Sequence, residues 1–185
     1  IEHKIAYSPN STQFSHVFNA GNSTVAGYET NYTNVYGWRV YAEPYQSSGT
    51  WYKNNASLVS EINITLPYSN VLVENVTLYV RTNGTGTHRQ LWIRVLNSTG
   101  DVVAELTNAT MGSDWTEVIL AVNGNVSNQL TVWINATVET KTTAGEELAV
   151  KDVRIYVRNE HSPIFSVYWE SNVDYFNCSA THVVE

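Results

Sequence analysis

The chain has 185 residues, of which 43% are hydrophobic, which is enough for one domain with a buried core. Its longest unbroken apolar run, Val118–Val122, is much shorter than the about 20 residues of a membrane-spanning helix. The net charge is -7 and the 10 basic residues are scattered, so the composition argues against nucleic-acid binding. The single cysteine, Cys178, has no internal disulfide partner. The chain opens at Ile1 rather than Met, which is typical of a processed protein.

Residues 1–24 are expected to form an N-terminal extension that contains a strand. Phe14, His16 and Phe18 alternate with other residues at the period of two that is typical of a strand. We expect this segment to act as a donor strand, which adds to the sheet edge of the next subunit in a polymer. The alternative is that it folds back on its own domain as an extra edge strand.

Residues 25–158 show repeated short segments in which apolar and polar residues alternate. The predicted strands span 61–66, 74–81, 90–96, 129–138 and 149–157. The expected core face of the last strand consists of Ala149, Val153, Ile155 and Val157. Turn-forming pairs such as Asn83-Gly84 separate the strands. This pattern predicts an all-β protein, an antiparallel β-sandwich in which each sheet has one polar face.

Residues 159–185 are expected to form a C-terminal extension with its own strand. Ile164–Trp169 is rich in the β-branched and aromatic residues that favour strands. Because terminal segments usually fray unless they are paired, we expect both extensions to be paired. Ile164–Trp169 is therefore the competing candidate for the donor strand.

Several motifs occur in an order that resembles the galactose-binding-like jelly rolls, a fold common among carbohydrate-binding modules. The motifs are Ala26-Gly27-Tyr28-Glu29-Thr30, Gly37-Trp38-Arg39-Val40, Asp114-Trp115-Thr116-Glu117-Val118 and Val150-Lys151-Asp152-Val153-Arg154-Ile155. The resemblance covers residues 25–158 and implies a jelly-roll sandwich, with Trp38 and Trp115 in its core. It also implies a structural calcium ion between the opening motif and the last strand, with Glu29 and Asp152 as ligands.

The sequence contains no recognisable catalytic motif. Its five histidines lack metal-ligand spacing, and neither a nucleophile elbow nor a phosphate-binding loop occurs. We therefore expect that the protein is not an enzyme.

Four aromatic residues form the candidate sugar-binding site. Tyr79, Trp92, Trp133 and Tyr156 fall on the polar sides of their predicted strands. Exposed rings in a row on one sheet face would stack on sugars. The alternative is that these rings pack under the terminal extensions or against a neighbouring subunit. Three candidate glycosylation sites share this polar side and would crowd it if occupied: Asn63, Asn75 and Asn135.

The sequon Asn-x-Ser/Thr is about three times as frequent as chance predicts. It occurs at 12 of the 20 asparagines, where the Ser and Thr content predicts about four. The sites are Asn10, Asn22, Asn31, Asn55, Asn63, Asn75, Asn83, Asn97, Asn108, Asn125, Asn135 and Asn177. We expect most of them to carry N-linked glycans, which implies a secretory route. The alternative is that an Asn- and Thr-rich strand composition creates the matches without selection for glycosylation.

The chain has many sequons but only one cysteine, so it cannot form an internal disulfide. This combination is more typical of an archaeal surface protein than of a eukaryotic ectodomain. We interpret the chain as an N-glycosylated structural subunit of an archaeal cell-surface filament such as a pilus or thread. It would polymerise with copies of itself, head to tail, by donor-strand complementation. The alternative function is a carbohydrate-binding module of a secreted protein. Both hypotheses place the chain outside the cell.

Overall fold

The computed structural model describes residues 4–9, 11–21, 26–32, 35–66, 72–84, 88–109, 111–158, 165–170 and 177–182. A short 3-10 helix, η1 (Ser11–Gln13), precedes the second strand. The strands are β1 (Lys4–Tyr7), β2 (Phe14–Asn19), β3 (Ala26–Tyr32), β4 (Val35–Ala42), β5 (Tyr45–Ser47), β6 (Thr50–Tyr52), β7 (Asn55–Thr65), β8 (Leu72–Gly84), β9 (His88–Leu96), β10 (Val102–Thr107), β11 (Thr116–Asn125), β12 (Gln129–Glu139), β13 (Glu146–Arg158), β14 (Phe165–Glu170) and β15 (Asn177–His182). Within these ranges, no helix is long and apolar enough to cross a membrane.

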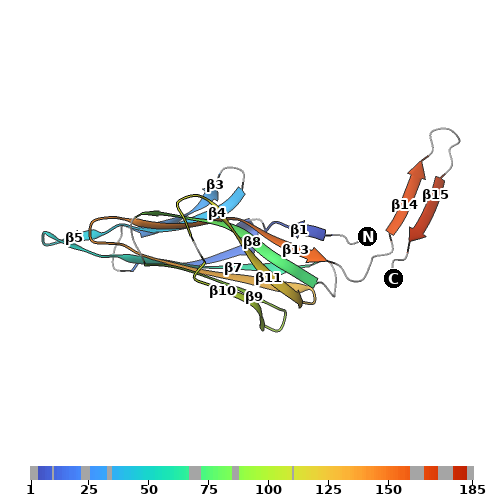
Figure 1. Ribbon diagram of the computed structural model, residues 1–185, viewed down its shortest axis with the longest axis horizontal. Helices are drawn as coiled ribbons and strands as arrows, with labels where there is room; N and C mark the ends of the chain where they lie inside the picture. Colours follow the sequence, from blue (N-terminus) through green and yellow to red (C-terminus); the bar gives the residue numbers. More distant parts are fainter. Residues whose placement is uncertain are drawn as a thin grey trace.

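The strands form two antiparallel sheets that stack face to face, so the predicted all-β antiparallel sandwich is confirmed (Figure 1). The β8 sheet has the order β11-β8-β13-β4-β3, and β1 also pairs with β13. The β12 sheet has the order β10-β9-β12-β7-β2. The two N-terminal strands therefore lie in different sheets of their own domain, as the alternative for residues 1–24 predicts.

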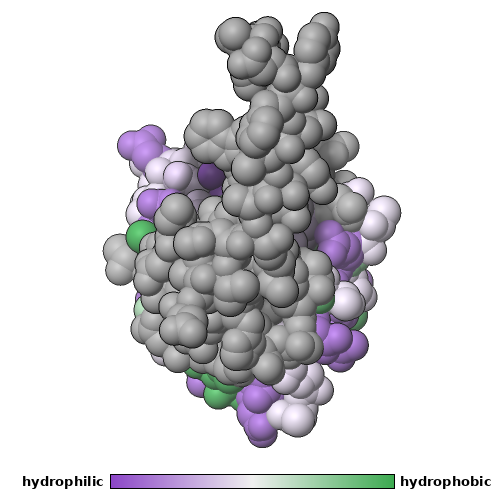
Figure 2. All heavy atoms as spheres, turned by 90° about the vertical axis from the view of Figure 1, so that its right-hand side faces the viewer, coloured by the Kyte–Doolittle hydropathy of each residue, from purple (hydrophilic) through white to green (hydrophobic). Residues whose placement is uncertain are grey.

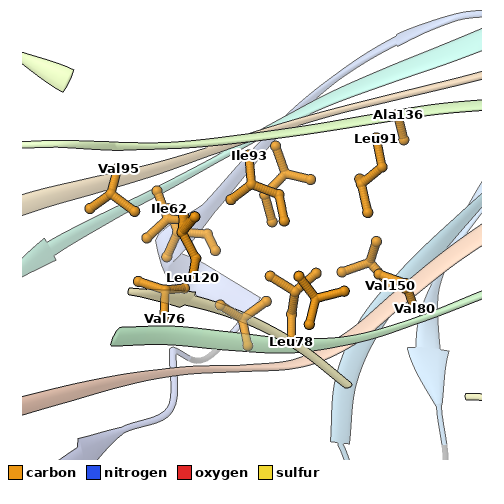
Figure 3. Close-up of a cluster of buried hydrophobic side chains, with 14 of the residues drawn as sticks. Ile62, Val76, Leu78, Val80, Leu91, Ile93, Val95, Leu120, Ala136 and Val150 are labelled. Atoms are coloured by element: carbon orange, nitrogen blue, oxygen red, sulfur yellow. The ribbon is translucent and has the colours of Figure 1, made fainter. Parts of the chain in front are cut away.

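The core lies between the two sheets and is built from the alternation seen in the sequence. In β12, every second residue from Leu130 to Val138 is buried, and the residues between them face outward. Figure 3 shows side chains of the β12 sheet (Ile62, Leu91, Ile93, Val95, Ala136) facing those of the β8 sheet (Val76, Leu78, Val80, Leu120, Val150). Because these side chains are apolar and removed from water, their burial is the main force that holds the sheets together.

The predicted core face of β13 is wrong at its first residue. The register against β8 shifts between Lys151 and Arg154, and Asp152 has a φ of 52°. Such a bulge changes which residues face inward. Leu148 and Val150 are therefore buried in the core cluster before the bulge, with Val153, Ile155 and Val157 after it. Ala149 is buried outside that cluster, at a position paired with Arg39 and Arg81.

Trp38 is fully buried in the core, as expected, but Trp115 is not a core residue. Trp115 is half-buried, and its ring lies 4.2 Å from the Lys151 ammonium and 4.8 Å from the Arg81 guanidinium, measured to the ring centroid. The ring of Tyr32 meets it edge-on at 5.2 Å. The role of Trp115 is thus to tie the start of β11 to β8, β13 and β3 through cation–π and aromatic contacts.

Two pairs of strands form small sheets of their own. β5 and β6 make a hairpin at one end of the sandwich, and β14 pairs with β15 (Figure 1). β14 corresponds to the strand predicted at Ile164–Trp169.

The end view in Figure 2 shows a coloured surface that is mostly hydrophilic, with separate hydrophobic spots.

β2 closes one edge of the sandwich with an aromatic cluster. Phe14, His16 and Phe18 point inward, whereas Val17 points outward and is 68% exposed. The Phe14 ring lies 4.3 Å from that of Tyr36, and His16 Nε2 forms a 2.7 Å hydrogen bond with the Tyr36 hydroxyl. Because Tyr36 belongs to β4, the cluster joins β2 to the other sheet. Exchange of β2 between subunits stays a prediction.

Acidification is expected to weaken this edge through His16. Burial lowers the pKa of His16 below its ordinary value of 6.5, so the folded protein takes up this proton less readily than the unfolded chain. The stability that neutral His16 contributes is present above about pH 6.5 and is lost as the pH falls below it. The groups that face the ring are aromatic (Phe14, Tyr28, Tyr36 and Trp38), and none supplies a counter-charge.

The measurement is urea unfolding at pH 7.5 and pH 5 for the wild type and His16→Phe. We expect the loss of stability between these pH values to be smaller in the variant. The other histidines are present in both proteins, so the difference reports His16 alone. An identical loss in both would contradict this prediction.

Candidate carbohydrate-binding site

The β5–β6 hairpin lies at one end of the sandwich (Figure 1). It carries Trp51, which is exposed. Ser48 and Gly49 form its turn with φ values of 49° and 80°, the left-handed region that tight hairpin turns require. Tyr45 and Tyr52 are paired across the strands, and their rings stack at 5.4 Å with an angle of 21°. The next pair, which alternation places on the other face, contains Trp51 with 53% of its surface exposed. The stacked tyrosines thus stiffen the support on which Trp51 stands.

Trp51 lines a hollow of about 300 Å³ together with Pro44, Thr142 and Thr143. These residues come from the segment before β5 and from the β12–β13 loop, which meet at this end of the sandwich. The hollow combines the flat indole and the proline ring with two threonine hydroxyls. It therefore offers an apolar wall and hydrogen-bonding groups to the same ligand.

A second hollow, of about 290 Å³, is more polar. It is lined by Tyr41, Glu43, Asn83, Gly84, Ala144, Gly145, Glu146 and Glu147. Glu43 precedes Pro44 and Ala144 follows Thr143, so both hollows are lined by the same two segments of the chain. Gly145 makes room for the carboxylate of Glu43, since a Cβ at this position would lie 2.6 Å from the Glu43 Cδ.

Asn54 holds the loops of this end together. Its backbone N–H donates to Thr140 Oγ1 at 2.8 Å, and its Nδ2 donates to the Glu43 carbonyl at 3.1 Å. The Thr140 N–H donates back to the Asn54 carbonyl at 2.8 Å. Asn54 and Thr140 are both buried, so these bonds are shielded from water and fix the segment that carries Glu43.

Three arginines near the second hollow are bound to glutamates. Arg39 forms ion pairs with Glu29 at 2.6 Å and with Glu147 at 2.8 Å, and Arg81 lies 3.6 Å from Glu147. The hydrogen bond with Glu29 raises the pKa of Arg39 above its ordinary value.

Arg89 bonds the buried carboxylate of Glu146, and it also donates to the Thr82 hydroxyl at 2.7 Å and to the Gly84 carbonyl at 2.9 Å. In the described part of the chain no ion pair involves Glu43, so its carboxylate faces the hollow without a cationic partner.

The four rings predicted to bind sugar do not share one face. Tyr79 and Tyr156 lie on the β8 sheet, and Trp92 and Trp133 lie on the β12 sheet. All four are half-buried on the outer sides of their sheets. The guanidinium of Arg94 covers the Trp133 ring at 5.3 Å. The expected single row is therefore replaced by two pairs on opposite faces of the sandwich.

The predicted calcium ligands are both bound by arginines. Glu29 pairs with Arg39, and Asp152 accepts hydrogen bonds from Arg154 at 2.7 and 3.0 Å. The two carboxylates are not directly paired. Glu29 on β3 is opposite Arg39 on β4, and Arg39 is opposite Ala149 on β13, three residues before Asp152. Among the described residues, no group of three or more His, Cys, Asp or Glu side chains could hold a metal ion. Calcium binding stays a prediction, and it would require both carboxylates to leave these partners.

The calcium prediction is tested by adding EDTA to the native protein and then restoring calcium. Bound calcium would lie between β3 and β13, so its removal would lower the melting temperature and calcium would restore it. A melting temperature that EDTA does not change would contradict the prediction.

The described sequon side chains are all at least partly accessible. Asn55, Asn63, Asn83 and Asn108 are exposed, and Asn75, Asn97 and Asn135 are half-buried. Asn97 also organises a turn, because its Oδ1 accepts hydrogen bonds from the backbone N–H groups of Thr99 and Asp101. Asn31, Asn125 and Asn177 lie in β3, β11 and β15. Asn10 and Asn22 lie outside the described residues. Occupancy of these sites stays a prediction.

Trp51 was not a candidate from the sequence, although a signal for it exists. Two aromatic residues follow the Ser48-Gly49 turn and one precedes it, which is typical of a short hairpin with cross-strand ring pairs. The hollows beside Trp51 have no comparable local signal, because they combine segments from four parts of the chain.

No family model matches the chain, and no curated protein matches it. Similar solved structures include TmCBM61 in complex with beta-1,4-galactotriose, with 11% identity and a TM-score of 0.43 over 84% of this chain and 88% of that chain. Another is the CBM22-1 xylan-binding domain from Paenibacillus barcinonensis Xyn10C, with 12% identity and a TM-score of 0.38 over 83% and 92%. Similarity of this extent does not transfer a ligand or an activity to the chain.

Proposed function

We propose that this domain is an extracellular carbohydrate-binding module, without catalytic activity, that takes its ligand at the hairpin end of the sandwich. The observation that carries the proposal is the exposed Trp51 ring, which lines one hollow, while a more polar hollow is lined by the same two segments of the chain. A sugar ring has an apolar C–H face and a rim of hydroxyls. The indole matches the face, and the side chains of Glu43, Asn83 and Tyr41 match the rim. A few fixed polar groups beside an apolar wall are typical of small-ligand sites.

The hairpin end is a better location for the sugar-binding site than the sheet faces, for a steric reason. Trp51 projects on a hairpin with 53% of its surface exposed, whereas Trp92 and Trp133 are half-buried. A polysaccharide chain can therefore reach Trp51 without displacing other side chains. The sequon Asn83 lines the second hollow, so a glycan there would narrow access to the site.

The proposal is tested with protein from a host that does not glycosylate it, screened against a panel of soluble polysaccharides by affinity electrophoresis. Binding to at least one is expected, followed by calorimetry on its oligosaccharides. Trp51→Ala should weaken affinity by about 30-fold, the equivalent of roughly 2 kcal/mol for burying one indole face. Trp133→Ala is the matched control and should leave affinity unchanged. If the control loses affinity and Trp51→Ala does not, the site is the sheet face; binding to no polysaccharide would refute the function.

A second candidate function, the self-assembling surface filament, is favoured by one feature of the fold. β2 is an edge strand that six consecutive residue pairs hold on β7, with Phe14 and Phe18 packed against the core. The same strand from another copy would fit the same position, head to tail. An archaeal, pilus-like filament built in this way is compatible with the abundance of sequons. Removing residues 1–20 tests it.

A further inference from the structure

The outer face of the β12 sheet carries an apolar row with a sequon at its centre. Across the sheet, Thr107 pairs with Trp92, Trp92 with Asn135, Asn135 with Val59, and Val59 with Val17. Val17 is 68% exposed at the end of this row. Apolar side chains therefore flank Asn135 on both neighbouring strands.

Trp133 adds a second ring along the same strand. It lies two residues before Asn135, and residues two apart in a strand share a face at about 7 Å. Trp92 is closer, since directly paired residues have Cβ atoms about 5 Å apart. Asn135 thus stands in the corner between two indoles.

Burial of one amide atom indicates how the Asn135 side chain is oriented. Asn135 Oδ1 and Trp92 Nε1 are both buried, and neither has a hydrogen-bond partner in the described chain. The buried Oδ1 therefore lies on the sheet side of the amide group, next to the directly paired Trp92. With Oδ1 turned toward the sheet, the amide nitrogen is the atom that faces outward. An N-glycan is attached through that nitrogen.

We propose that Asn135 carries an N-glycan whose first sugar packs on Trp92 and Trp133, so that these rings hold the chain's own carbohydrate. The sugar's C–H face covers indole surface that otherwise faces water, on Trp92 and on the side of the Trp133 ring that Arg94 does not cover, and this burial stabilises the folded state. This inference is independent of the hairpin-end site. It also gives the β12 sheet face a different occupant from a soluble polysaccharide.

Asn63 supplies a matched control on the same sheet face. It is an exposed sequon on β7, with Glu61 and Thr65 two residues away and Thr131 opposite. Of the two rings, Trp133 lies diagonally across the ladder from Asn63, and Trp92 is one strand further away. Thr131 donates a 2.8 Å hydrogen bond to Asn63 Oδ1. A glycan on Asn63 would therefore reach one ring at most and add less stability than a glycan on Asn135.

The experiment uses the full chain secreted from a glycosylating host. Peptide mass spectrometry should find Asn135 occupied. Thr137→Ala removes this sequon and should lower the melting temperature by about 3 °C, the shift that a 1 kcal/mol contribution gives at this size. Thr65→Ala, which removes the Asn63 sequon, should change it by less than about 1 °C. In a Trp92→Ala/Trp133→Ala background, Thr137→Ala should no longer lower the melting temperature.

Enzymatic trimming avoids any dependence on variants that fail to fold. Wild-type protein trimmed to the first sugar should keep its melting temperature, whereas complete deglycosylation should lower it. An unmodified Asn135, or a loss from Thr137→Ala that persists without the two rings, would overturn the proposal. Equal melting temperatures for trimmed and fully deglycosylated protein would also overturn it.

Discussion

Replacing Arg89 by methionine is expected to lower the free energy of unfolding by about 3–5 kcal/mol. The reason is the carboxylate of Glu146, whose side chain is 0% exposed and whose partner is Arg89, itself 18% exposed. Without the guanidinium, a buried negative charge has lost its counter-charge. Arg89 also bonds Thr82 and Gly84, so the end of β8 would lose its connection to β9. Chemical denaturation at pH 7 measures the effect.

Arg94→Met is the matched control for this prediction. Arg94 pairs with Glu105 at 2.9 Å, but their side chains are 39% and 38% exposed, and solvent screens such a pair. We expect a loss below about 1 kcal/mol. Adding Glu146→Leu to Arg89→Met should recover most of the stability, because it removes the uncompensated charge. A loss of less than 1 kcal/mol for Arg89→Met alone would show that the buried pair does not stabilise this end.

The strands could be predicted from the sequence because burial on one face leaves a period of two. In β12 the predicted and observed core residues agree from Leu130 to Val138. The partners of a strand leave no such trace. The alternation of Phe14, His16 and Phe18 is the same whether their strand pairs with β7 of the same chain or with β7 of another subunit. Only the fold shows that the strand pairs with β7 of the same chain. The bulge at Asp152 likewise has no signal in the sequence. Alternation alone therefore predicts Ala149 on the wrong face of β13.

The candidate site could be predicted only in part, for a related reason. Alternation placed Trp92 and Tyr79 on polar faces, which is correct, but it does not indicate which sheet a strand joins. The hollows at the hairpin end combine segments near Glu43, Asn83 and Thr142, far apart in the sequence. Such a site follows from topology, and no single stretch of residues predicts it.

Removing residues 1–20 is expected to destabilise the domain by about 3 kcal/mol. Phe14 and Phe18 are half-buried against the core, and each contributes about 1–2 kcal/mol through burial. The truncation also removes β1, so the ladders on β7 and on β13 are both lost. Their hydrogen bonds each contribute about 1 kcal/mol, and most of this is offset by the entropy cost of ordering the two strands. Thermal or urea unfolding of the truncated chain measures the loss. Val17→Ala is the control, since Val17 points outward and its change should stay within about 0.5 kcal/mol.

The same truncation separates an internal edge strand from a strand exchanged between subunits. A synthetic peptide of Ile1–Ala20 should bind the truncated chain and raise its stability in a concentration-dependent way, because the position beside β7 is then open. If subunits also exchange β2, negative-stain imaging of the full chain will show fibres, and the truncated chain will form none. Fibres from the truncated chain would exclude the N-terminal donor and favour the C-terminal segment at Ile164–Trp169. A truncated chain as stable as the full one would show that β2 does not seal this edge.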